Sequence, residues 1–340
     1  MSLGLHRLCK PPRWVFSTFL LGWAALALGF SVALQATPAL AEDKTEKDDI
    51  LPPADIDLAT EDGLEMKATY FPGTKGQESI PVILLHGFGK GSRKDFTQEQ
   101  GLAPFLQEKL GCAVIVPDLR GHGESTKIKV GNRVDKLDGK KLRPNQIGVM
   151  VTEDLVAVKD FLWKKNNEKA LNLDKLAVIG VEEGAGLALS YAAYDAIGYE
   201  QHQVKLGPLK LGRFVKAAVL ISPATNVSGL KTAQRMKTPE ICRELPVMIV
   251  AGNKSKDRFA EAERLYKQFV SGRPAADDDK PESMTVWFFK KIDTPLQGSK
   301  LLAEPSLKVP EKIVTFLSSR LVKNADAREW VWKERKLPYE

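Results

Sequence analysis

The stretch "AVIGVEEGAGLALSYAA", residues 177–193, decides the fold of this chain. Its apolar start is typical of a buried strand, and the alanine- and leucine-rich part after Gly184 is typical of a helix. A turn of the form Gly-x-x-x-Gly joins them and places Glu182 at its centre. A sharp turn from strand to helix strains the central residue and leaves room only for hydrogen beside it, which explains Gly180 and Gly184.

The same alternation of strand and helix runs along most of the chain. Continuous apolar runs rich in β-branched residues predict buried parallel strands at residues 81–87, 112–119, 175–180, 216–222, 246–252 and 284–289. Helical periodicity lies between and after them, at residues 96–110, 146–163, 184–197, 258–270 and 306–321. From Asp57, two alternating segments joined by Glu61-Asp62-Gly63 predict a hairpin. The pattern predicts an α/β fold with a mostly parallel eight-stranded sheet, an N-terminal hairpin and helices on both faces.

Three motifs follow in order along residues 54–322. His86-Gly87-Phe88-Gly89 comes directly after a predicted strand, Asp118-Leu119-Arg120-Gly121-His122-Gly123-Glu124-Ser125 follows the next, and the turn from Gly180 to Gly184 is the third. Together they resemble the α/β-hydrolase superfamily, in its esterase and serine aminopeptidase branches. The resemblance implies the α/β-hydrolase fold, with a minimal lid because only residues 223–244 separate two consecutive strands.

The resemblance also assigns roles to pocket residues. The His-Gly loop would face the developing negative charge with the backbone N–H of Phe88, joined by that of Glu183 after the elbow. His86, Gly87, Phe88, Glu183 and Gly184 are therefore the expected residues of the oxyanion site and pocket. His86 is structural in that family, and a histidine such as His122 in a turn is usually held by local hydrogen bonds.

The catalytic positions depart from the family pattern. Glu182 stands where the family has its nucleophile. After the strand at 246–252, Ser255 occupies the likelier place of the acid and Asp257 is a displaced candidate. After the last predicted strand, "KKIDTPLQGSKLL" contains no histidine, and no histidine occurs after His202. His202 is expected in a polar loop away from the pocket.

The missing base separates two hypotheses. A serine or carboxylate nucleophile needs a base that activates water, and a glutamyl ester would stall without one. The first hypothesis is a protein with a degenerate triad that acts by binding a small molecule or a protein. The alternative is a working hydrolase of ester or amide bonds that uses Glu182 with Asp257 or Asp293. Glu182 and Glu183 also suit the start of a helix, where negative charge is favoured. Nothing in the sequence predicts a cofactor or a metal site.

The N-terminus reads as an export signal. Arg7, Lys10 and Arg13 precede an apolar run over residues 14–34, and Ala39-Leu40-Ala41 forms an Ala-x-Ala cleavage site. We expect a signal peptide over residues 1–41 and a periplasmic or secreted protein; the alternative is an uncleaved membrane anchor. Residues 42–53 are an expected flexible tether, residues 54–322 the domain, and residues 323–340 a tail whose Trp330 and Trp332 pack on it.

Charge and cysteine content limit the partners further. The net charge is +7, with a basic cluster from Lys127 to Arg143. Aspartates and glycines interrupt this cluster and it has no aromatic residue, so we expect a solvated loop and no nucleic-acid partner. A membrane contact is expected only if the N-terminal segment is retained. Cys112 and Cys242 precede strands that lie several positions apart in the expected sheet, so both should be free thiols.

Overall fold

A computed structural model describes residues 50–206, 213–224, 226–230, 244–271, 287–323 and 330–335, with Gln234, Lys237, Thr238 and Ile241; for 198–206 it describes the backbone only. The residues from Glu46 onward form one compact unit. The export signal, most of the tether and Cys242 therefore lie outside the described residues. None of the described helices is long and apolar enough to cross a bilayer.

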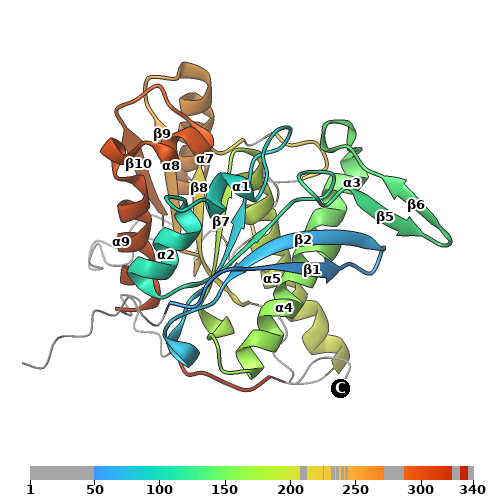
Figure 1. Cartoon of the computed structure of the whole chain (residues 1–340). Helices are drawn as coiled ribbons and strands as arrows, with labels where there is room; N and C mark the ends of the chain where they lie inside the picture. Colours follow the sequence, from blue (N-terminus) through green and yellow to red (C-terminus); the bar gives the residue numbers. More distant parts are fainter. Residues whose placement is uncertain are drawn as a thin grey trace, which may run out of the picture. The chain divides into compact units, whose positions relative to one another are not determined.

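A mostly parallel sheet forms the centre of this unit (Figure 1). Its strands are β1 (Ala54–Ala59), β2 (Leu64–Phe71), β3 (Pro81–Leu85), β4 (Ala113–Pro117), β5 (Lys127–Val130), β6 (Arg133–Lys136), β7 (Leu176–Val181), β8 (Val215–Ile221), β9 (Val247–Gly252) and β10 (Trp287–Ile292). The order across the sheet is β10-β9-β8-β7-β3-β4-β2-β5-β6, with β1 paired to β2. β3, β4, β7, β8, β9 and β10 run parallel, which brings the loops after them to one edge.

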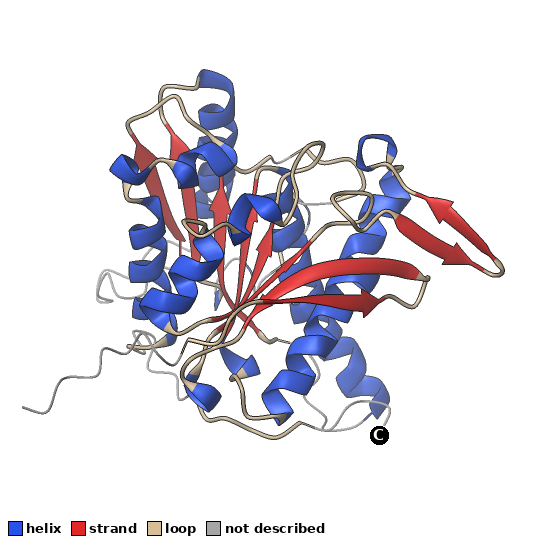
Figure 2. Cartoon of the chain, viewed as in Figure 1, coloured by secondary structure: helices blue, strands red, loops and turns tan. Residues whose placement is uncertain are grey.

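Helices cover both faces of the sheet (Figure 2). The helices are α1 (Lys94–Thr97), α2 (Leu102–Leu110), α3 (Pro144–Val149), α4 (Leu155–Asn167), α5 (Glu183–Leu206), α7 (Lys256–Ser271), α8 (Gly298–Ala303) and α9 (Val309–Leu321). One apolar cluster joins α4, α5 and α7 to the sheet, and a second joins α2, α8 and α9 to it. The strands between them are buried on both sides, which explains their unbroken apolar sequences.

The fold prediction is confirmed, and several of its details are corrected. The sheet has ten strands, because residues 127–136, expected to be a loop, form the hairpin β5–β6. β10 ends at Ile292 and not at residue 289; its charged Lys290 and Lys291 are exposed on an edge strand, which hides them from a pattern that seeks apolar runs. α5 continues to Leu206, so His202 lies in a helix and not in a loop.

Glycine and a wider helical turn interrupt two predicted helices. The helix expected over 96–110 is broken before Leu102, where α2 begins. Gly101 lies at this break, and only glycine fits there, because a Cβ would lie 2.2 Å from the carbonyl oxygen of Phe96. The helix expected over 146–163 begins at Pro144 and contains a π-helical segment at Met150–Asp154. Neither change moves the strands.

The described part of the tail packs on the domain, as predicted. The indole of Trp332 donates to the carbonyl of Asn166 at 3.2 Å, and Trp330 lies against the second apolar cluster. Arg335 forms an ion pair with Asp174 at 2.6 Å and lies over the ring of Phe214 at 4.7 Å from its centroid. These contacts tie residues 330–335 to the end of α4 and the start of β8.

Candidate active site

The turn between β7 and α5 has the geometry of a nucleophile elbow. Glu182 has φ +53°, in the left-handed region that a side chain rarely adopts. A Cβ at Gly180 would lie 2.1 Å from the carbonyl oxygen of Gly184, and one at Gly184 would lie 2.5 Å from that of Leu85. The Glu182 backbone is fixed to β8, because its N–H donates to Ile221 O at 2.9 Å. The sequence-predicted strain is therefore present, and tertiary contacts hold it in place.

The carboxylate of Glu182 lies between two glycine backbones. A Cβ at Gly87 would lie 2.8 Å from its Oε2, and a Cβ at Gly298 would lie 2.6 Å from its Oε1. These glycines come from the loops after β3 and β10, so Glu182 occupies the space where those loops meet. Burial raises the pKa of Glu182, and the neighbouring charge of Glu183 raises it further. No hydrogen bond or ion pair within the described residues involves this carboxylate.

The His-Gly loop after β3 lies beside the elbow, but its expected oxyanion donor is engaged. The N–H of Phe88 donates to Oε2 of Glu183 at 3.0 Å. The other carboxylate oxygen of Glu183 is 3.8 Å from the guanidinium of Arg258, on α7. We expected the Phe88 N–H to face a developing negative charge; the structure gives that position to a carboxylate of the chain itself. Sequence reasoning missed this contact, because it assigned Glu183 a backbone N–H role and a charge at the start of the helix, and no side-chain contact with the His-Gly loop.

Gln297 occupies the loop after β10 where the family has its histidine. Its amide nitrogen donates to Gly252 O at 2.7 Å, and its oxygen accepts from the hydroxyl of Ser222 at 2.6 Å. The same hydroxyl accepts from the N–H of Gly298 at 2.9 Å. Gln297 thus ties the ends of β8, β9 and β10 together. It is a neutral amide with both polar atoms in use, and an amide does not serve as a general base at neutral pH.

The candidate acids lie at the surface. Asp257 is exposed in the first turn of α7, and no hydrogen bond or ion pair within the described residues involves it. Asp293 is exposed and pairs with Lys254 at 2.9 Å. Ser255 precedes α7 and its carbonyl accepts the N–H of Phe259 at 3.0 Å. The described structure joins none of the three to Glu182 by a hydrogen bond.

The described histidines are parts of the loop framework. His86 is fully buried; its Nδ1 contacts Gly87 O at 2.7 Å and its Nε2 accepts from Leu119 N at 3.0 Å. Burial lowers the pKa of His86 to about 4, so the ring is neutral. His122 contacts Arg120 O through Nδ1 at 2.9 Å and accepts from Gly89 N through Nε2 at 3.0 Å. His6 and the side chain of His202 lie outside the described structure.

Comparison with known proteins identifies this arrangement. The family model for the alpha/beta hydrolase fold matches residues 80–237, which include the His-Gly loop and the elbow. The chain therefore has the α/β-hydrolase fold. No curated protein sequence matches it.

Solved esterase structures share the fold of this chain. The esterase Pf2001 of Pyrococcus furiosus is 19% identical, with 82% of this chain and 96% of the other covered at a TM-score of 0.51. A Pyrobaculum calidifontis esterase is 15% identical, with 81% and 86% covered at 0.53. Fungal esterases of Rhizomucor miehei give 15% identity, 80% and 84% coverage and 0.52. At this identity the likeness concerns the fold alone.

A buried ionic network supports the α/β-hydrolase loops on the β4 side. Asp118 accepts from Arg93 at 2.5 Å and from the N–H of Glu124 at 2.9 Å. Arg120 pairs with Asp62 at 2.6 Å and with Asp154 at 2.5 Å. Arg93 and Arg120 follow β3 and β4 closely in sequence, where a basic side chain could pair with Glu182. The structure instead buries both arginines among aspartates.

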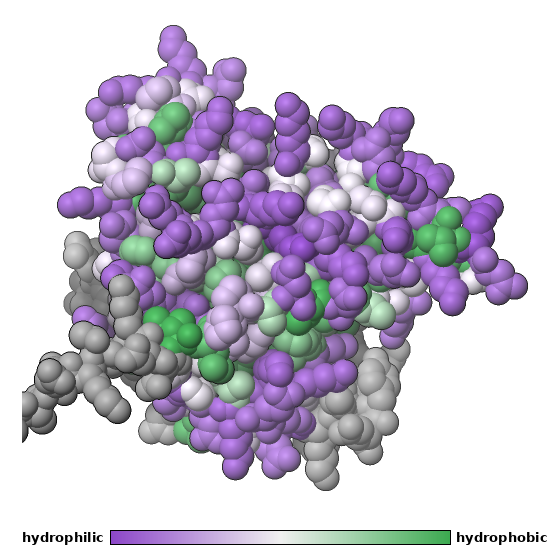
Figure 3. Space-filling model, in the orientation of Figure 1, coloured by the Kyte–Doolittle hydropathy of each residue, from purple (hydrophilic) through white to green (hydrophobic). Residues whose placement is uncertain are grey.

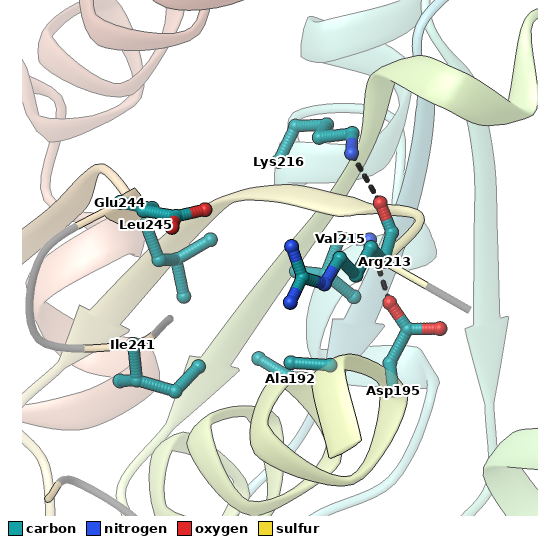
Figure 4. A pocket seen from close by; sticks show the side chains of 9 residues that line it. Ala192, Asp195, Arg213, Val215, Lys216, Ile241, Glu244 and Leu245 are labelled. Atoms are coloured by element: carbon teal, nitrogen blue, oxygen red, sulfur yellow. Dashed lines mark hydrogen bonds between the residues drawn. The ribbon is translucent and has the colours of Figure 1, made fainter. Parts of the chain in front are cut away.

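A small pocket lies at the other end of β8 (Figure 4). Its volume is about 50 Å³, and its lining residues include Ala192, Asp195, Arg213, Val215 and Glu244. Asp195 accepts the N–H of Val215 at 3.0 Å, so this carboxylate stabilises the entry of β8. The described residues hold no cluster of three or more His, Cys, Asp or Glu side chains suited to a metal ion. The elbow therefore remains the site with the most distinctive chemistry.

Proposed function

We propose that this α/β-hydrolase-fold protein is exported and acts by binding a ligand at the elbow, without turning it over. One observation carries the proposal: the N–H of Phe88, which an esterase would aim at an oxyanion, donates to the carboxylate of Glu183. A carboxylate already in that position repels a second developing negative charge. Glu182 in place of a serine and Gln297 in place of a histidine also argue against turnover.

The same geometry favours a ligand that is positively charged or rich in N–H groups. Glu182 is half-buried, its carboxylate has no hydrogen-bond partner within the described residues, and its pKa is raised. A polar group left in this state gains most from a donor supplied from outside. An ammonium or amidinium group beside Glu182 would also reduce its repulsion with Glu183.

The export part of the proposal rests on the order of basic, apolar and Ala-x-Ala segments at the N-terminus. N-terminal sequencing of the protein recovered from outside the producing cell is expected to begin at Glu42. A sequence beginning at Met1 or Ser2 in a membrane fraction would show an anchor instead.

Steady-state hydrolysis of p-nitrophenyl esters and aminoacyl anilides tests the lack of turnover. We expect wild type and Glu182→Gln to equal the uncatalysed rate, and Glu182→Ser to do the same because Glu183 still holds the Phe88 N–H. Glu182→Ser with Glu183→Ala and Gln297→His is expected to exceed the matched variant that lacks the histidine. A wild-type rate that disappears in Glu182→Gln would contradict the proposal and establish a carboxylate mechanism.

Binding is measured separately. Benzylamine and benzamidine are expected to raise the unfolding temperature of wild type, and the rise is expected to disappear in Glu182→Gln but persist in Glu263→Gln, an exposed control on α7. An equal response in both variants would show binding elsewhere. Because this measurement needs no turnover, it separates failure of the ligand class from failure of the non-catalytic assignment.

A further inference from the structure

The hairpin β5–β6 extends beyond the rest of the sheet. β5 pairs with β2 only at Ile128 and Lys127, and the remaining pairs are within the hairpin itself. In Figures 1 and 2 the two strands project from the body at the right. A Cβ at Gly131, in the turn, would meet nothing within 4 Å. A two-stranded ribbon of this kind has no apolar core of its own. Packing within the hairpin therefore does not explain which residue types lie on its surface.

Residues 127–143 account for all of the net positive charge outside residues 1–41. Residues 127–143 contain seven basic and two acidic residues, a net +5 of the chain's +7. Residues 1–41 contribute a further +3, so all the remaining residues together have a net charge of −1. Outside residues 1–41, the net positive charge therefore comes from the hairpin and the residues that follow it.

Three lysines lie on one face of the hairpin, and one of them, Lys127, is also directly opposite Glu65 of β2. Lys127 is directly opposite Lys136, and both are exposed on the same face of the ribbon as Lys129. Like charges in directly opposed positions destabilise a strand pair. No ion pair within the described residues involves these three lysines. Lysine on the edge strand β6 would by itself be explained as protection against edge pairing, but Lys127 and Lys129 lie on the inner strand β5.

Exposed valines accompany these charges at the tip of the hairpin. Val130 is 52% exposed and Val134 is 57% exposed. Figure 3 shows a green patch at the right, surrounded by purple, on the side where Figure 1 draws the hairpin. Val134 is directly opposite Lys129 and shares the face of the lysines, whereas Val130 is opposite Arg133 and lies on the other face of the ribbon, next to the turn. Apolar side chains flanked by long basic ones match the boundary between lipid headgroups and acyl chains, where the lysine amines stay among the headgroups.

The base of the hairpin is anchored close to the candidate active site. The N–H of Gly139 donates to Gly121 O at 2.8 Å, and a Cβ at Gly139 would lie 2.5 Å from the ring of His122. His122 in turn accepts the N–H of Gly89 in the His-Gly loop. The hairpin is thus fixed relative to the elbow.

We propose that the β5–β6 hairpin is a docking surface for an anionic membrane, bound by Lys127, Lys129 and Lys136 with Val130 and Val134 at the lipid interface. A nucleic acid would use the same charges, but residues 127–143 contain no aromatic side chain on which a base could stack. The exposed valines have a place in a lipid interface and none in a phosphate groove. This inference is independent of the proposed elbow function.

Vesicle co-sedimentation tests the proposal on the chain from Glu46, which is a compact unit separate from the apolar N-terminal segment. We expect binding to phosphatidylcholine vesicles that contain phosphatidylglycerol and none to phosphatidylcholine alone. Neutralising Lys127, Lys129 and Lys136 to Gln is expected to weaken binding about 10- to 100-fold at about 0.15 M salt. Val130→Ser with Val134→Ser is expected to weaken it by a smaller factor that persists at high salt, when electrostatic attraction is screened.

A matched control neutralises three other exposed lysines, Lys164, Lys256 and Lys323, and is expected to bind like wild type. Equal weakening in this control would show that binding depends only on the net charge of the protein, and would overturn the proposal. Absence of binding to the anionic vesicles would overturn it as well. Tighter binding to a single-stranded oligonucleotide through the same lysines would also overturn it, in favour of a nucleic-acid surface. Unfolding midpoints equal to wild type confirm that the exposed substitutions leave the fold intact.

Discussion

The buried charges beside β4 form ion pairs, whereas the carboxylate of Glu182 at the elbow has no ion-pair partner within the described residues. Beside β4, Arg93 and Arg120 are almost fully buried and each is paired with aspartate. At the elbow, Glu182 is half-buried next to another carboxylate, and its oxygens contact glycine backbone positions. Charges that support a fold are normally paired when buried. The contrast supports the proposal that Glu182 serves ligand binding and not stability.

Removing Arg120 should produce the largest effect, because it breaks the paired region. Arg120→Ala leaves Asp154, whose side chain is 1% exposed, without its partner. We expect the free energy of unfolding to fall by about 3–5 kcal/mol, since an uncompensated buried charge remains. Denaturant unfolding followed by circular dichroism measures the change.

The matched control is Arg133→Ala. Arg133 also pairs with an aspartate, at 2.7 Å from Asp135, but its side chain is 74% exposed. We expect a change within about 0.5 kcal/mol. Comparable losses in the two variants would show that burial does not distinguish these pairs, and the comparison above would lose its basis.

The sequence predicts the scaffold better than the contacts at the site. The parallel strands and the elbow are visible because burial on two faces leaves unbroken apolar runs, and because Gly180 and Gly184 are required by steric contacts within a few residues. The predicted end of β10, residue 289, is three residues early, since an exposed edge tolerates Lys290 and Lys291. The β5–β6 hairpin was read as a loop, because its charges hide the alternation of a strand.

The contacts that bear on function join residues far apart in the chain. Glu183 reaches Phe88, 95 residues away in sequence, and Gln297 reaches Ser222, 75 residues away. A one-dimensional pattern shows that a histidine is missing after β10, but it does not show which group takes its place. The absence was therefore predictable, whereas the occupied Phe88 N–H and the role of Gln297 required coordinates.

A methyl group added at the elbow should have an intermediate effect on stability. It tests whether the turn needs a residue without a side chain. In Gly180→Ala the new Cβ would lie 2.1 Å from the carbonyl oxygen of Gly184, so β7 and α5 must move apart. We expect a loss of about 1–3 kcal/mol in the free energy of unfolding, together with loss of amine binding at Glu182. Thermal unfolding and the benzylamine titration measure the two effects.

Gly148→Ala is the control for this substitution. Gly148 lies in α3, and its added Cβ would be 3.6 Å from the nearest atom, an ordinary contact. Because alanine is the better helix former, we expect unchanged or slightly increased stability, by up to about 1 kcal/mol. A loss similar to that of Gly180→Ala would mean that the elbow is no tighter than an ordinary helix.

The smallest expected effect is the change in stability on removing the charge of Glu182. The sign of this change is what the experiment tests. Its folded-state pKa is raised above the ordinary value of 4.5, chiefly by burial, so folding disfavours the ionised form. Well below pH 4.5 the side chain is protonated in both the folded and the unfolded state, and its substitution by glutamine should change little. As pH rises through the folded pKa, wild type loses stability relative to Glu182→Gln, which should therefore be the more stable protein at pH 7.

Glu263 provides the opposite case, because its hydrogen bond to Lys267 lowers its pKa. Glu263→Gln should therefore be less stable than wild type at pH 7, and the difference should shrink as the solution is acidified. Unfolding midpoints of the three proteins between acidic and neutral pH decide the matter. If Glu182→Gln were instead the less stable protein at pH 7, the carboxylate would have a stabilising partner, and the elbow would belong with the paired charges beside β4.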